Sequence, residues 1–157
     1  ALRLTQQGLS KNPFDTRLLL LASQLSYELH YERKAEDYLL KAKDNAEDLE
    51  EIALRLSNLY LEQERFDEVL KFEEQDIDNV LTKWNIARAY QALEHTKAAV
   101  ERYRLLLSDL KENPEFLEQY IYLLREMGDF EEAKHQAEHY LHLVPDDVEM
   151  QELYNSL

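Results

Sequence analysis

The chain has 157 residues, of which 45% are hydrophobic and 32% charged, enough apolar material for one compact domain. Only two glycines and three prolines argue against β-sandwiches, barrels and nucleotide-binding folds built on glycine-rich turns. A net charge of −15 disfavours nucleic acid as a partner, and the lack of cysteine excludes disulfides, thiolate metal sites and cysteine nucleophiles. No apolar run is long enough to span a membrane, so membrane insertion is not expected.

Apolar residues recur with helical spacing along the chain, as in the stripe formed by Leu18, Leu21, Ala22, Leu25 and Leu29. No stretch shows the alternation with period two that a half-buried β-strand requires. In chain order the pattern predicts helices at residues 1–11, 15–29, 32–44, 47–63, 66–76, 79–93, 96–111, 115–127, 130–143 and 146–157. The sequence therefore predicts an all-α fold.

Small residues mark an internal repeat: Ala1, Ala35, Val69, Ala99 and Ala133 follow one another at intervals of 34, 34, 30 and 34 residues. A similar frame precedes each of the last four, in the form Ser23-x-x-Ser26, Leu56-Ser57-x-x-Tyr60, Ile86-Ala87-x-x-Tyr90 and Tyr120-Ile121-x-x-Leu124. The shorter interval predicts a shortened second helix or connector around residues 75–79. Each repeat holds two helical patterns, which predicts helix pairs that bury their apolar faces on neighbouring pairs.

The unit from Trp84 to Tyr103 and the turn from Met127 to Ala133 resemble the tetratricopeptide repeat. The resemblance covers the whole chain and implies a right-handed superhelical solenoid of antiparallel helix pairs. We expect one domain over residues 1–157, divided into 1–13 (the second helix of a truncated repeat), four repeats at 14–46, 47–78, 79–113 and 114–145, and 146–157 as the start of a further repeat or a cap. Ser23, Ser57, Ala87 and Ile121 stand where the family has glycine, and the large Ile121 predicts a wider helix gap in the last repeat.

The aromatic residues of the repeat pattern are expected in the core rather than in a site. They are Tyr60, Phe66, Tyr90, Tyr103 and Phe130, and repeats of this kind place such side chains between the helices. We also expect the small residues to lie where two helices of a pair cross closely, so that a larger side chain there would destabilise the fold.

No pattern of catalytic residues is present: the chain lacks a phosphate-binding glycine loop, a His-Glu-x-x-His motif and a nucleophile elbow. The acidic run at residues 73–78 lacks the glycine and the distal glutamate of a calcium loop, which favours a solvated acidic face. His135, His139 and His142 share one helix face and are a weak candidate for zinc or nickel, but this face points away from the apolar side and lacks a fourth ligand. We therefore predict no enzyme activity, no metal and no cofactor.

Charge is distributed unevenly between the two helices of each pair. The four first helices, at 16–29, 50–63, 80–93 and 114–127, carry 0, −2, +2 and −2, whereas the whole chain carries −15. The resemblance implies that first helices line a concave groove and second helices form the back. A nearly neutral groove in a strongly acidic protein fits a binding surface for a peptide or a helical segment of a partner.

The resemblance also implies which side chains face this groove. They are Arg17, Gln24 and Tyr27; Arg55, Asn58 and Glu62; Trp84, Asn85, Arg88 and Gln91; and Glu118, Gln119, Tyr122 and Arg125. The register favours an accessible Trp84 stacked with Arg88, and the alternative is that Trp84 covers the preceding helix pair across the short repeat. Members of the family that bind acidic chaperone tails need a clamp of Lys, Arg and Asn, of which only Asn58 and Asn85 are present here, so such a tail is not expected.

The sequence thus predicts a non-catalytic protein-interaction module, with Trp84 as the apolar anchor and an arginine on each first helix to hold polar or acidic groups. The alternative is a scaffold or spacer that self-associates through exposed terminal helices. An enzyme would require a catalytic domain elsewhere. The start at Ala1 rather than Met favours an excised fragment. An acidic, cysteine-free composition suits a bacterial or archaeal cytoplasm, although a periplasmic or lipoprotein-anchored relative would look the same.

Overall fold

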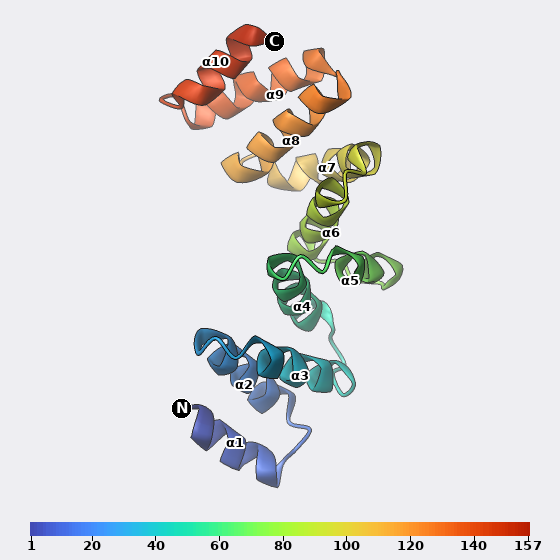
Figure 1. Cartoon of the computed structure of the whole chain (residues 1–157), viewed down its shortest axis with the longest axis vertical. Coiled ribbons are helices and arrows are strands. Elements are labelled where there is room, and N and C mark those ends of the chain that lie inside the picture. Colours follow the sequence, from blue (N-terminus) through green and yellow to red (C-terminus); the bar gives the residue numbers. More distant parts are fainter. The chain divides into compact units, whose positions relative to one another are not determined.

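The computed structural model describes all 157 residues and is entirely helical (Figure 1). Its elements are α1 (Leu2–Lys11), α2 (Thr16–Glu28), α3 (Glu32–Lys43), α4 (Glu50–Glu62), α5 (Phe66–Leu70), the 3₁₀ helix η1 (Lys71–Glu74), α6 (Val80–Ala92), α7 (Thr96–Leu110), α8 (Pro114–Met127), α9 (Phe130–Leu143) and α10 (Val148–Ser156). The predicted all-α class is confirmed, and most helix ends fall within two residues of the predicted ones.

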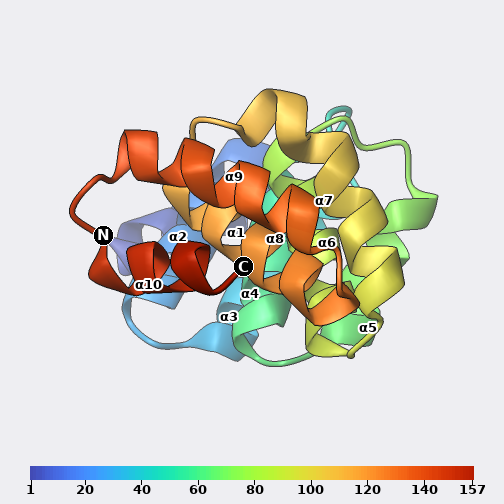
Figure 2. The ribbon, with the colours of Figure 1, turned by 90° about the horizontal axis from the view of Figure 1, so that it is seen from above.

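The chain forms two compact units, at residues 1–85 and 86–157, and the boundary falls within α6. In the first unit each helix packs on the next, from α1 to α5, and the most extensive contact joins α2 with α3. In the second unit α7 packs on α8, α8 on α9 and α9 on α10, and Figure 2 shows α10 lying beside α9. Helices thus pack mainly on their neighbours in sequence, as repeats do.

The short repeat interval has the consequence that the sequence predicted. Where other repeats have a second helix of at least three turns, residues 66–74 form only α5 and the 3₁₀ helix η1, and Gln75 is extended. Phe72 and Ile77 are both buried in this segment. Five residues apart, they would point to different sides of a continued α-helix, so the helix must end for both to enter the core.

The small residues of the repeat lie where helices cross. Ala35, Val69, Ala99 and Ala133 are all buried at 1% exposure or less, whereas Ala1 is exposed. In the first full pair the two helices approach so closely that Ser23 Oγ donates a hydrogen bond to the carbonyl oxygen of Ala35 at 3.0 Å. A larger side chain at these positions would push the helices apart.

The turns inside the four helix pairs repeat the same backbone. His30, Glu64, Glu94 and Gly128 have φ values of 60°, 56°, 60° and 81°, in the left-handed region. In every case the next residue donates its N–H to the carbonyl five positions back, at 2.8–2.9 Å. This is the Schellman motif, in which a left-handed residue ends one helix and the chain turns into the next.

The predicted aromatic core is only partly present. Tyr60 and Tyr103 are buried, Phe66 and Tyr90 are partly exposed, and Phe130 is 52% exposed. The prediction for Phe130 is wrong. A helical side chain covers the turn on the N-terminal side of its own Cα, and Phe130, the first residue of α9, has no such turn to pack on.

Candidate functional site

The first unit presents a face made by two first helices, α2 and α4. We call it the α2–α4 face; its predicted members are Arg17, Gln24, Tyr27, Arg55, Asn58 and Glu62. Five of these side chains are exposed and Arg55 is partly buried. The predicted residues of α2 and α4 are thus accessible, unlike the two predicted residues of α6 in this unit.

Hydrogen bonds between the helices hold several of these side chains in place. The Tyr27 hydroxyl donates to the Glu62 carboxylate, with O–O distances of 2.7 and 2.8 Å. Arg55 Nη1 donates to the carbonyl oxygen of Leu20 at 3.3 Å, and Arg55 Nη2 pairs with Glu51 at 2.6 Å. The bond to Glu62, with a smaller contribution from burial, raises the pKa of Tyr27, so its hydroxyl stays protonated and remains a donor at neutral pH.

Trp84 and Asn85 do not belong to an accessible surface. Trp84 is 7% exposed and Asn85 is 4% exposed, so the prediction of an accessible Trp84 is wrong. Asn85 Nδ2 donates to Ser57 Oγ at 2.9 Å and to Asn58 Oδ1 at 2.7 Å. The amide of Asn85 therefore joins α6 to α4, and the two asparagines bond each other.

The second unit has a corresponding surface, formed by the end of α6 and by α8. Its predicted members are Arg88, Gln91, Glu118, Gln119, Tyr122 and Arg125; Glu118 and Arg125 are exposed and the others are partly buried. The Arg125 guanidinium lies 5.2 Å from the centre of the Tyr122 ring. The Tyr103 hydroxyl of α7 donates to Gln119 Oε1 at 2.7 Å and lies 3.2 Å from Gln91 Oε1. These contacts order the polar side chains of both first helices.

The sequence analysis missed two exposed apolar residues on first helices of the first unit. Leu21 of α2 is 47% exposed and Leu81 of α6 is 46% exposed, similar to Tyr27 at 40%. Counting by the 34- and 30-residue intervals aligns Leu21 with Arg55, and Leu81 with Arg17. The repeat register therefore places both leucines at positions that hold arginines of the predicted binding surface. The apolar stripe of α2, to which Leu21 belongs, instead suggests a buried residue.

The three histidines of α9 do not form a metal site. No group of three or more His, Asp or Glu side chains lies in an arrangement that could hold a metal ion. His139 Nε2 lies 2.9 Å from the carbonyl oxygen of Lys111, whereas His135 and His142 are exposed. A ring nitrogen that donates to a carbonyl oxygen carries a hydrogen, so Nε2 of His139 is not free to bind a metal in this arrangement.

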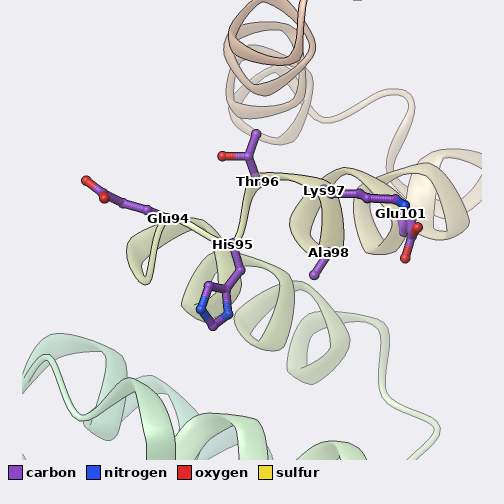
Figure 3. A pocket seen from close by; sticks show the side chains of 6 residues that line it. All are labelled: Glu94, His95, Thr96, Lys97, Ala98 and Glu101. Atoms are coloured by element: carbon purple, nitrogen blue, oxygen red, sulfur yellow. The ribbon is translucent and has the colours of Figure 1, made fainter.

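A shallow depression lies at the turn between α6 and α7 (Figure 3). Glu94, His95, Thr96, Lys97, Ala98 and Glu101 line it. The His95 ring lies 6.2 Å from the Tyr90 ring, centre to centre, and serves packing at the turn. The depression is open and most of its lining side chains are charged or polar, so it does not have the character of a ligand pocket.

Residues 81–147 match the family described as YpiA-like, C-terminal tetratricopeptide repeats. No curated protein matches the chain. No helix combines the length and the apolar content needed to cross a membrane.

Solved structures similar to this chain are repeat proteins of low sequence identity. YrrB, described as a TPR protein with an unusual peptide-binding site, has a TM-score of 0.81 at 16% identity, over 96% of this chain and 79% of its own. MamA of Desulfovibrio magneticus RS-1 has a TM-score of 0.80 at 12% identity, over 94% of this chain and 85% of its own. TTC0263, a thermophilic TPR protein in Thermus thermophilus, has a TM-score of 0.64 at 19% identity, over 99% of this chain and 87% of its own.

At these identities the solved structures establish the fold and leave the partner open. The 34-residue spacing of buried small residues, the repeated turns and the matched repeats at 81–147 agree with that fold. The chain therefore has the tetratricopeptide repeat fold, and its residues 81–147 match a family of such repeats.

Proposed function

We propose that the chain is a non-catalytic binding module that takes a peptide segment of a partner protein on its first-helix surfaces. One observation carries the proposal: Leu21, Tyr27 and Leu81 expose apolar surface on first helices that also bear arginines. Aromatic, aliphatic and arginine side chains on one surface are typical of binding hot spots. The fold supports the proposal, since tetratricopeptide repeats generally bind proteins, and YrrB is described as having a peptide-binding site.

On the α2–α4 face, Leu21 and Tyr27 would contact apolar side chains of the peptide. Arg17 would bind its carboxylates, while Arg55 and Asn58 would bind polar backbone groups. Arg55 already contacts Glu51 and the Leu20 carbonyl, so little side-chain entropy would be lost when a peptide binds beside it. Asn85 supports this surface through its bonds to Ser57 and Asn58, and Trp84 is buried, so neither side chain would contact the peptide.

In the second unit, the side chains that would contact the peptide are Arg88, Gln91, Gln119, Tyr122 and Arg125. Arg125 lies over the Tyr122 ring, which presents a cation and an aromatic face together. Gln91 and Gln119 would read peptide amides while the Tyr103 hydroxyl holds the Gln119 side chain.

The test is a selection of random displayed peptides on the wild-type protein, followed by calorimetric titration of the selected peptides. We expect Leu21→Ala and Tyr27→Ala combined to weaken binding by about tenfold or more. The control is Leu105→Ala, which removes an exposed leucine from the second helix α7 and is expected to change the Kd less than about twofold. Peptides that bind the double variant as tightly as the wild type would contradict the α2–α4 face as the site.

A scaffold role is the second candidate, because the terminal helices expose large apolar residues. Leu4 of α1 is 72% exposed and Val148 of α10 is 62% exposed. If these helices joined neighbouring copies, sedimentation would show a mass that rises with concentration, and Leu4→Glu with Val148→Glu would abolish the rise. A constant monomer mass would remove this candidate.

A further inference from the structure

The first quarter of the chain differs in charge from everything that follows. Residues 1–43 contain seven basic and five acidic residues, whereas residues 44–157 contain eleven basic and 28 acidic residues. The basic excess therefore lies on α1, α2 and α3, within a protein whose total charge is −15. Such a local reversal of sign is a feature that an oppositely charged partner can recognise.

Much of this basic charge lies along the junction of α1 and α3, two helices that are second helices of their repeats. Gln6 Nε2 of α1 donates to the Tyr38 hydroxyl of α3 at 3.2 Å. Lys34 and Lys41 lie one turn before and one turn after Tyr38, on the same flank of α3. Arg3 lies one turn before Gln6 on α1. All three cations are exposed, and α1 contains no acidic residue.

Two aromatic rings accompany the lysines. The Lys34 ammonium lies 5.0 Å from the centre of the Tyr31 ring, and the Lys41 ammonium lies 5.8 Å from the centre of the Phe14 ring. Tyr31 is 50% exposed and Phe14 is 62% exposed. The surface thus offers apolar area and positive charge together, as anchored binding of a peptide requires.

Most carboxylates near Lys34 and Lys41 form their hydrogen bonds and ion pairs with other residues. Glu36 forms a bidentate pair with Arg65, with distances of 2.7 and 3.0 Å, on the opposite flank of α3. Glu32 accepts from Gln63 on that flank, and Asp15 accepts the Leu18 N–H and caps α2. Asp37 is the acidic residue between the two lysines, and neither lysine forms an ion pair with it. The lysines are therefore available to a partner.

The repeat register shows that this surface is not a general property of the fold. The position of Lys34 holds Glu68, Ala98 and Glu132 in the later repeats. The position of Lys41 holds Gln75, Leu105 and His139. No later repeat has a lysine at either position, so both lysines are particular to α3.

We propose that this surface docks a short acidic segment of a partner protein that carries an aromatic or aliphatic anchor. The α1–α3 surface consists of Arg3, Gln6, Phe14, Tyr31, Lys34, Tyr38 and Lys41. The acidic side chains would pair with the lysines and Arg3, and the anchor would pack on Phe14 or Tyr31. This is a second docking surface and does not depend on the α2–α4 face.

A short polypeptide fits this surface better than an extended anion does. A membrane or a nucleic acid duplex would also approach the rest of the same unit, whose residues 44–85 carry 13 acidic against four basic side chains. Repulsion from those groups opposes such partners, while a short segment contacts the α1–α3 surface alone.

In the experiment, random displayed peptides are selected on the wild-type protein. Peptides that also bind the double variant, in which Lys34→Glu and Lys41→Glu are combined, are then removed. We expect the remaining peptides to be acidic and to contain an aromatic or aliphatic residue. In fluorescence anisotropy the double variant should weaken their binding by about tenfold or more, and about 0.5 M salt should also weaken it. Lys34→Arg with Lys41→Arg, which keeps the charge, should preserve binding.

The matched control is Arg33→Glu with Lys97→Glu, which changes the net charge equally at exposed positions outside this surface. It should leave the Kd within about twofold, as should Leu21→Ala with Tyr27→Ala, which tests the α2–α4 face separately. Equal loss in the matched control, selected peptides without acidic residues, or no specific peptides at all would overturn the proposal. Pelleting of the protein with phosphatidylserine vesicles or binding of duplex DNA would also overturn it. A third contrary result would be self-association of the protein that salt weakens and the double lysine variant abolishes, without any binding of peptides.

Discussion

The turn at Gly128 and the turn at Glu94 have the same backbone but different local sequences. Gly128 adopts a left-handed φ of 81°, and Asp129 caps α9 by accepting the Glu132 N–H at 3.3 Å. Glu94 adopts a φ of 60° without the freedom of glycine, and no side chain at His95 caps α7. Both turns nevertheless close the same hydrogen bond to the carbonyl five positions back.

The comparison teaches that helix packing, not local preference, determines this backbone. A left-handed conformation costs a residue with a side chain about 1–2 kcal/mol. Glu94 adopts it because Ala99, five residues later, must enter the crossing of α6 and α7, as Ala133 does after Gly128. Of these two turns, only the one at Gly128 has a residue, glycine, that adopts the left-handed conformation without a steric cost.

The largest expected effect comes from the buried small residues on which both turns depend. Ala99→Leu and Ala133→Leu should each lower the free energy of unfolding by about 1–3 kcal/mol, since both sites are fully buried. Urea unfolding followed by circular dichroism measures this. Ala92→Leu, at an exposed position of α6, is the control. Unchanged midpoints for both buried variants would show that the repeat register is wrong.

Exchanging the left-handed residues tests the difference between the turns directly. Gly128→Ala should lower the free energy of unfolding by about 1–2 kcal/mol. An added Cβ meets no atom within 4 Å there, so the loss is one of backbone conformation alone. Glu94→Gly should raise it by about 0.5–1 kcal/mol, because relief of the left-handed strain exceeds the added freedom of the unfolded chain. Opposite signs in a thermal or urea melt would contradict the comparison.

The capping residues give the next effect. Asp129→Ala should lower the free energy of unfolding by about 1 kcal/mol, while Asp129→Ser should retain most of it because serine also accepts the N–H. His95→Asp should stabilise α7 by a similar amount, since no side chain occupies that role. A His95→Asp variant no more stable than the wild type would mean that packing already fixes the start of α7.

The smallest expected effect is a difference in acid sensitivity between capped and uncapped helices. Asp147 caps α10 by accepting the Met150 N–H at 3.0 Å, and it accepts the Tyr140 hydroxyl at 2.7 Å. These bonds, the backbone one first, lower the pKa of Asp147. The cap therefore stabilises the fold above the ordinary pKa of aspartate and is lost as the pH falls through the lowered value.

Asp147→Asn should reduce the loss of stability between neutral pH and about pH 3, measured by urea midpoints. His95→Asn serves as the control at the uncapped turn and should leave that acid-dependent loss unchanged. If Asp147→Asn and wild type lose stability in parallel on acidification, Asp147 has no altered titration in the folded protein.

The sequence predicted the features that depend on spacing along the chain. The helix positions followed from the spacing of apolar residues. The buried small residues and the shortening of one second helix, expected around residues 75–79, followed from the repeat intervals. The predicted members of the α2–α4 face came from the resemblance to the tetratricopeptide repeat, which implies the side of each first helix that faces the groove. Residue spacing does not identify the peptide partner, because one fold can bind many different ligands.

Other features were decided by what lies opposite each residue in the folded protein. Trp84 and Asn85 share helical positions with accessible residues of other repeats, yet both are buried. His139 contacts the carbonyl of Lys111 rather than its helical neighbours, and Leu21 remains 47% exposed. Position on a helix follows from sequence alone, but burial depends on side chains distant in sequence, and only the packed structure brings those together.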